Sequence, residues 1–269
     1  MADPLALLVV VVTGVAYALG RERWNRRAAR SMVATRELAL FGAGLVTIAV
    51  ALVSPIDSAA DTSLPAHMVQ HVLLLTVAAP LLAFGMPLPT LLWALPTRLR
   101  RRSVAFTRKL MRHHDRHFPT WIVLMLVVEA LVMLGWHLPV AYEAAIRHPG
   151  IHAVEHVSFV LAATAAWWSV STARRSLRGA AAIAGLFGSI PGMALGAAMV
   201  LAPRPWYPIY VRGSAADALS NQQLAGVIMW AFGGMAAVVA GAALFAAWLA
   251  SEPTDASSRI ARIPSRATR

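Results

Sequence analysis

Long apolar runs with almost no charged residues alternate along the chain with short segments that carry most of its charge. A helix needs about 20 mainly apolar residues to cross the roughly 30 Å hydrocarbon core of a membrane. Runs of this kind recur from the start of the chain to about residue 250. We therefore predict an all-α, polytopic membrane protein with seven transmembrane helices, at about Pro4–Gly20, Glu37–Val53, Pro65–Phe84, Pro119–Gly135, His152–Val170, Gly179–Leu201 and Gln222–Ala250.

Basic residues predict how these spans are oriented. Of the 24 Lys and Arg residues, all but Arg147, Arg204 and Arg212 fall in four blocks. Cytoplasmic loops carry an excess of Lys and Arg, so we predict an N-terminus outside and a C-terminus inside. Residues 1–250 then form one transmembrane domain, and residues 251–269 form a polar cytoplasmic tail. The four blocks are Arg21–Arg36, Arg98–Arg116, Arg174–Arg178 and Arg259–Arg269.

The amino-acid composition excludes several classes of protein. Hydrophobic residues make up 58% of the chain and charged residues 13%, whereas a soluble domain carries about a quarter charged residues. The net charge of +12 lies mostly in the predicted cytoplasmic loops, which favours contact with anionic membrane lipid over nucleic acid. The chain has no cysteine, which excludes disulfides and thiolate metal sites. Its only lysine, Lys109, lies in a predicted inner loop, which excludes a retinal Schiff base.

Five histidines fall at the predicted outer ends of three spans. His67 and His71, like His152 and His156, are four residues apart, which places both imidazoles of each pair on one helix face. His137 follows the fourth span. Ionisable groups at this depth face the bundle interior, and imidazole is a good ligand for copper or zinc. We predict that the five converge in a metal site; the alternative is separate hydrogen bonds to loop carbonyls.

Several neighbours of these histidines are auxiliary candidates. Gln222 and Gln223 open the predicted seventh span at the same level, where they either hold a ligand imidazole by a hydrogen bond or cap the helix. Glu155 is a ligand, a counter-charge or a solvated outer residue. Met68 and Met229 offer thioethers that favour Cu(I), although methionines in such helices usually serve packing.

Glu129 lies in the middle of the fourth span, among leucines and valines. An acidic residue at this depth is a functional candidate, either as a proton relay or as a protonated group bonded to a neighbouring helix. Histidines within His113–His117 lie among arginines and are interpreted as a solvated face. Tyr207 lies near a span end, where interfacial aromatic residues are common. Small-xxx-small spacing in the sixth span predicts close helix packing, at Gly185, Gly188, Gly192 and Gly196.

The combination of these motifs resembles the multi-span CtaG family of bacterial cytochrome c oxidase (caa3-type) assembly factors, from about Ala60 to Gly234. That resemblance implies a multi-pass protein of the bacterial cytoplasmic membrane that matures a haem–copper oxidase, with the five histidines as matching positions. The family often has an acid before the paired glutamines, where this chain has Asn221. The motifs are His67–His71 with Ala79–Leu82, Trp136–Pro139, His152–His156 and Gln222–Trp230.

Three function classes follow. The first is a non-enzymatic assembly factor that binds copper at its outer face and delivers it to cytochrome c oxidase subunits. The second is a copper permease, which needs ligands through the bilayer midplane; only Glu129 and scattered methionines are visible there. The third is a haem-binding membrane protein, with haem, like zinc, a weaker fit than copper. The oligomeric state is left open.

Overall fold

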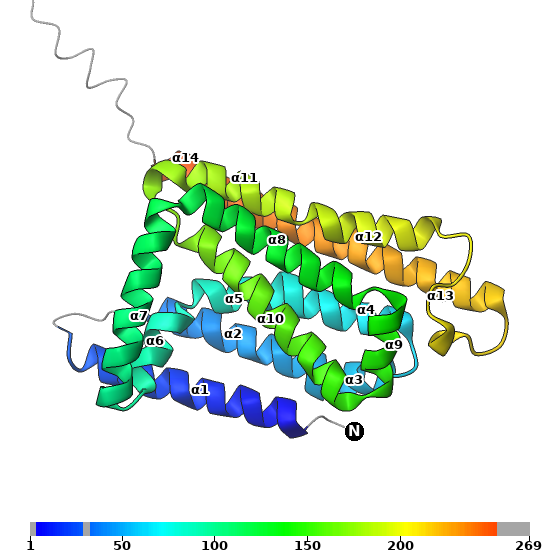
Figure 1. The fold of residues 1–269 in the computed structure, drawn as a ribbon, viewed down its shortest axis with the longest axis horizontal. Coiled ribbons are helices and arrows are strands. Elements are labelled where there is room, and N and C mark those ends of the chain that lie inside the picture. The colour runs from blue at the N-terminus through cyan, green and yellow to red at the C-terminus, as the bar shows by residue number, and fades with distance from the viewer. Residues whose placement is uncertain (1–3, 29–32, 252–269) are drawn as a thin grey trace, which may run out of the picture.

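The computed structural model describes residues 4–28 and 33–251, which form helices joined by short connections, without any strand in those ranges (Figure 1). Among these residues, seven helical stretches are long and apolar enough to cross a membrane. The predicted all-α, seven-span fold is therefore confirmed. The spans are Leu5–Asn25, Thr35–Val53, Leu64–Phe84, Phe118–Trp136, Pro149–Ser171, Arg178–Leu201 and Ala215–Ala246.

Short helices join or prolong these spans. The first half of the chain contains α1 (Pro4–Asn25), α2 (Thr35–Val53), α3 (Pro55–Ala60), α4 (Leu64–Val72), η1 (Leu73–Ala78), α5 (Ala79–Phe84), α6 (Pro87–Ala94), α7 (Thr97–Arg116) and α8 (Phe118–Trp136). The second half contains α9 (Pro139–Arg147), α10 (Pro149–Ser171), η2 (Arg175–Leu177), α11 (Arg178–Gly188), α12 (Ile190–Leu201), η3 (Pro208–Tyr210), α13 (Ala215–Ile228), η4 (Met229–Gly233) and α14 (Gly234–Ser251).

The third span is one continuous helix with a wide turn in its middle. Segment η1 is π-helical, and the amide of Ala79 donates to the carbonyl of Leu74, five residues earlier. The next residue, Pro80, has no amide hydrogen, and its ring clashes with the preceding turn of a regular helix. Widening of the turn ahead of this proline relieves that clash. The wide turn follows directly after α4, which carries His67 and His71.

The sixth and seventh spans are also irregular. Between α11 and α12 the helix breaks at Ser189, two residues before Pro191, which cannot donate the next helical hydrogen bond. The seventh span contains a second π-helical turn, η4. It also begins at Ala215, because the Ser214 side chain accepts a hydrogen bond from the Asp217 amide and caps the helix. The predicted start at Gln222 was therefore two turns too late.

The two ends of the bundle differ in charge. The arginine-rich helix α7 lies across one end, whereas α3, α9 and the connection between α12 and α13 lie at the other (Figure 1). The second end contains the largest buried apolar cluster, which includes Met68, Tyr142, Phe159 and Tyr207. The outward orientation of this end stays a prediction, because it rests on charge alone. The predicted tail lies almost wholly outside the described residues.

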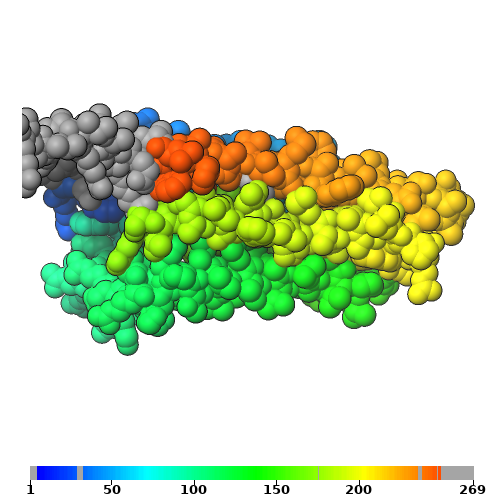
Figure 2. All heavy atoms as spheres, turned by 90° about the horizontal axis from the view of Figure 1, so that it is seen from above, coloured from blue at the N-terminus to red at the C-terminus, as the bar shows by residue number. Residues whose placement is uncertain are grey.

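Close backbone contact joins the sixth and seventh spans. Figure 2 shows α11 and α12 between α8 and the seventh span. A Cβ atom on Gly226 would lie 2.5 Å from the Gly196 carbonyl oxygen, so only glycine fits there. The predicted packing role of the glycine stripe is confirmed at Gly196.

At the arginine-rich end, the expectation of a wholly solvated histidine face was wrong. His114 is buried, with its ring against Phe118, Trp121 and Trp168. His113 and His117 remain exposed, as expected.

Candidate metal centre

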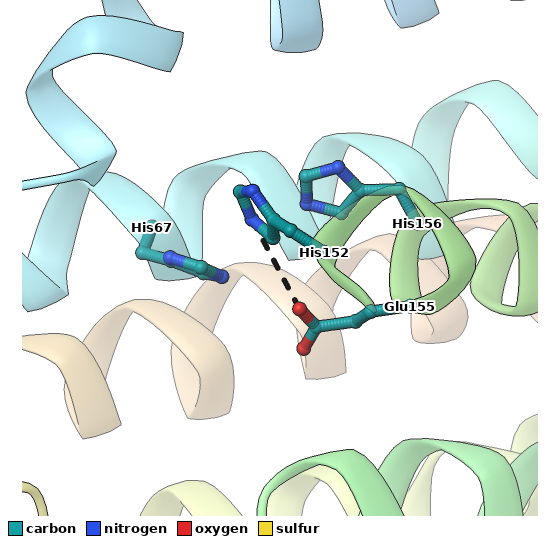
Figure 3. Close-up of side chains that lie close together, drawn as sticks. All are labelled: His67, His152, Glu155 and His156. Atoms are coloured by element: carbon teal, nitrogen blue, oxygen red, sulfur yellow. Dashed lines mark ion pairs between the residues drawn. The ribbon is translucent and has the colours of Figure 1, made fainter. Parts of the chain in front are cut away.

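Six side chains from three spans meet at the end of the bundle opposite α7. One ligand atom from each of His67, His152, Glu155 and His156 lies within 4.8 Å of the others. Figure 3 shows His67, on α4, extending toward the three residues on α10. His71 joins them, because its Nε2 atom is 3.5 Å from Glu155 Oε1.

His137 completes the group from the fourth span. Its Nε2 atom lies 3.3 Å from His71 Nδ1. The predicted convergence of the five imidazoles is therefore confirmed, whereas their binding of a metal stays a prediction.

Local sequence signals set the height of these residues in the bundle. Ser63 accepts a hydrogen bond from the Ala66 amide and starts α4, so His67 and His71 fall in its first turns. Pro149 occupies the first turn of α10, a position that suits proline because the first amides of a helix lack partners. His137 caps the carboxyl end of α8. The starts of α4 and α10 and the end of α8 therefore lie at the same level of the bundle.

The cluster is almost completely closed to solvent. His67, His71 and Glu155 are fully buried, as are the rings of His137 and His156 to within a few per cent. Only His152 reaches the surface, with 18% of its side chain exposed. The alternative interpretation of Glu155 as a solvated outer residue was therefore wrong.

Hydrogen bonds fix which nitrogen of His137 and His71 carries the proton. His137 Nδ1 lies 2.7 Å from the Met133 carbonyl oxygen, which only accepts, so Nδ1 donates. Burial lowers the pKa of His137 to about 4, against the opposing effect of this hydrogen bond, so the ring is neutral at pH 7 and its Nε2 is an acceptor. His71 Nδ1 then donates to it. The Nε2 lone pair of His71 is left facing Glu155.

The same reasoning orients His67. The Tyr210 hydroxyl donates its one hydrogen to the Ala60 carbonyl oxygen over 2.9 Å. The hydroxyl oxygen therefore accepts from His67 Nδ1, 3.4 Å away. Because Nδ1 carries the proton, the lone pair of His67 is on Nε2, the atom that belongs to the cluster.

Several buried atoms of the cluster have no hydrogen bond within the described residues. They are Nε2 of His67, of His71 and of His156, and both carboxyl oxygens of Glu155. Buried polar atoms nearly always have a partner, and leaving one without costs about 1–3 kcal/mol. Imidazole nitrogens gathered beside a carboxyl group in this way make up the donor set that a metal cation needs.

Three buried tyrosines surround the cluster, and sequence reasoning missed this role. The Tyr207 hydroxyl donates to the His137 carbonyl oxygen over 2.9 Å, and the hydroxyls of Tyr142 and Tyr210 lie 3.3 Å apart. Burial raises the pKa of all three, so they are neutral donors. The interfacial interpretation of Tyr207 was wrong. A signal was present, because three of the four tyrosines lie in predicted outer segments.

The paired glutamines bond to backbone and not to imidazoles. Gln222 is buried, accepts from the Trp206 amide over 2.6 Å and donates to the Met199 carbonyl oxygen over 3.2 Å. Gln223 donates to the Val200 carbonyl oxygen. Neither residue caps the helix, which begins seven residues earlier at Ala215. Gln222 instead holds the connection that carries Tyr207 and Tyr210 against the bundle.

Of the remaining candidates, Met68 serves packing, whereas Met229 and Glu129 line a separate cavity. Met68 is fully buried in the apolar cluster beside the histidines. Met229 belongs to the same apolar cluster and also lines a cavity deeper in the bundle, together with Glu129. Within the described residues Glu129 makes no hydrogen bond to a neighbouring helix, and its interpretation as a proton relay stays a prediction.

The fold and this cluster define a class: helical multi-pass membrane proteins with a buried, histidine-rich ligand set at one end of the bundle. Residues 15–251 match the family model described as cytochrome c oxidase caa3 assembly factor (Caa3_CtaG). The chain belongs to this family, as its motifs predicted. No curated protein and no solved structure gave a significant match. The family points to a bacterial membrane.

Proposed function

We propose that this protein binds copper at the five histidines and Glu155 and delivers it to a subunit of a caa3-type oxidase. It acts as an assembly factor and not as an enzyme. The observation that carries the proposal is the set of buried ligand atoms on His67, His71, His156 and Glu155 that have no hydrogen bond within the described residues. Membership of the family supports the oxidase as the recipient. The charge pattern supports a position of the cluster at the outer face of the bacterial cytoplasmic membrane.

The donor set supports copper over zinc and haem. Nitrogen and oxygen sites bind copper more tightly than any other divalent first-row metal, zinc included. Neighbouring imidazole rings in the cluster have centroids only 4.2 to 6.2 Å apart. A haem between two axial histidines needs a wide plane that is free of other side chains, whereas five imidazole rings and a carboxyl group are packed together here.

A protein that delivers copper needs a site from which the metal can dissociate. The cluster offers more donors than copper uses at once, so a ligand can be released while others still hold the ion. His152 is the one member that reaches the surface. We infer that a partner subunit approaches there and that copper passes by stepwise exchange of ligands.

Oxidase maturation tests the proposal. In a bacterial host that makes a caa3-type oxidase but lacks its own family member, we expect this chain to restore the copper content and activity of the oxidase. Glu155→Gln keeps the shape of the side chain but removes its charge, and we expect maturation to fall about 10- to 100-fold. Copper per oxidase and oxygen uptake in isolated membranes provide the measurement.

His148→Ala is the matched control, because His148 lies one turn before His152 but is exposed and makes no side-chain cap. It should mature the oxidase as the unaltered chain does. Full maturation by Glu155→Gln, at equal amounts of protein in the membrane, would contradict the proposal.

Tyr210→Phe tests the hydrogen bond that orients His67. The substitution removes only the hydroxyl that accepts from His67 Nδ1. Loss of such an orienting partner typically weakens metal binding about 10- to 100-fold, and we expect that range in a copper competition titration. Tyr17→Phe is the control, because it removes a buried hydroxyl that donates to the Gly85 carbonyl oxygen, away from the cluster. Equal copper affinities for the two variants would rule out the orienting role.

A further inference from the structure

We propose that a second Cu(I) site lies deeper in the bundle, in a cavity that begins at His71 and contains Glu129, Met193 and Met229. This inference rests on the proposed function, because it describes a second place where copper is held, next to the histidine cluster. The methionines look scattered along the sequence, but in the structure Met193 and Met229 lie close to the same space. They line one cavity together with the mid-span carboxyl group.

The cavity has a volume of about 90 Å³ and lies within the membrane-spanning part of the bundle. His71 and Met133 line it at the histidine end, and Val170 and Gly185 line it at the other. His71 belongs to both the cavity and the cluster, and its Nε2 lone pair faces Glu155. One imidazole thus stands between the two sites.

Three irregular helix segments border this same cavity. Leu75 and Thr76 come from the π-helical turn η1, Met229 and Gly233 come from η4, and Ser189 is the break between α11 and α12. Such turns are rare and occur frequently at functional sites. Their coincidence around one small space indicates that the space is built into the fold and is not a packing defect.

Part of the glycine stripe lines the cavity. A Cβ atom on Gly192 would meet only Met133 Cε, at 3.8 Å, and one on Gly185 would meet Val170 at 3.4 Å. These two glycines therefore lie in ordinary van der Waals distance of side chains on other spans, whereas Gly196 packs against backbone. Both positions also line the cavity.

The cavity brings together the ligands that suit Cu(I). Thioethers are soft donors that select this ion, and Glu129, on releasing its proton as the metal binds, would supply one negative charge to match the single positive charge of the ion. Within the described residues, the Glu129 carboxyl has no hydrogen bond or ion pair, and intramembrane acids of this kind mark ion sites. Met193 Sδ lies 3.8 Å from the Ser189 hydroxyl at the helix break. When the cluster holds Cu(I), passage from His71 replaces nitrogen donors by sulfur donors, and the oxidation state of the copper does not change.

Copper titration of the full chain in lipid nanodiscs tests the inference. Under anaerobic conditions, with Cu(I) supplied from a competing chelator, we expect the unaltered protein to take up a second equivalent beyond the one at the histidines. Glu129→Gln, Met193→Leu and Met229→Leu, singly and combined, should abolish that second equivalent and its sulfur signal in copper X-ray absorption. The first equivalent should stay. Met235→Leu is the control, because Met235 lies on α14 with 61% of its surface exposed.

The possible outcomes separate the two claims. If the unaltered protein binds no copper, the proposed function fails. If it binds copper but the cavity variants keep the same stoichiometry and spectrum, only the second site is overturned. Circular dichroism and gel filtration check that each variant is folded, and Glu129→Gln alone, which keeps the side-chain shape, still decides the result if the combined variant does not fold.

Discussion

Replacing His71 and His156 with alanine is expected to give a folded protein that retains no copper after purification. The two residues supply buried Nε2 lone pairs from two different spans, so their loss removes ligands from both sides of the cluster. Losing one orienting partner of a metal ligand already costs about 10- to 100-fold in affinity, and losing two ligands should cost more. Copper per chain, measured by mass spectrometry of the metal after dialysis, is the readout.

His148→Ala again serves as the matched control and should keep its copper. Circular dichroism should show unchanged helix content in both variants. The account fails here if the double variant holds as much copper as the control.

Gly226→Ala is expected to destabilise the protein by about 1–3 kcal/mol. The added methyl carbon would lie 2.5 Å from the Gly196 carbonyl oxygen and 2.9 Å from Val200. Backbone atoms of α12 cannot yield as a flexible side chain does, so the sixth and seventh spans must move apart. Thermal unfolding in detergent, followed by circular dichroism, should show a lower midpoint.

Gly42→Ala is the control for this effect, because a Cβ atom on Gly42 meets nothing within 4 Å. Alanine stabilises a helix by about 1 kcal/mol relative to glycine, so this variant should unfold at the same or a higher temperature. A Gly226→Ala variant as stable as Gly42→Ala would show that the two spans do not pack as described.

The fold and the histidine cluster could be predicted because each depends on a local pattern. Apolar length fixes the number of spans. The spacing of four residues fixes which imidazoles share a helix face, and their nearness to span ends fixes their level. Glu155 could not be assigned in this way, because its direction depends on how α10 is rotated against α4.

Contacts made by irregular segments could not be predicted. Tyr210 reaches His67 from the connection between α12 and α13, and Gln222 holds that connection in place. Such a segment has no regular repeat, so the sequence does not predict the directions in which its side chains point. The cavity was missed for a related reason, since Glu129 and Met193 line a space that is bordered by the irregular segments η1 and η4 and by the break at Ser189.

Copper X-ray absorption of the purified protein at one copper equivalent tests the central claim most directly. The account predicts nitrogen or oxygen neighbours at about 2 Å, with the outer-shell pattern of imidazole, and loss of that signal in the His71→Ala, His156→Ala variant. Copper held mainly by sulfur at this loading, or a spectrum unchanged in the variant, would contradict it.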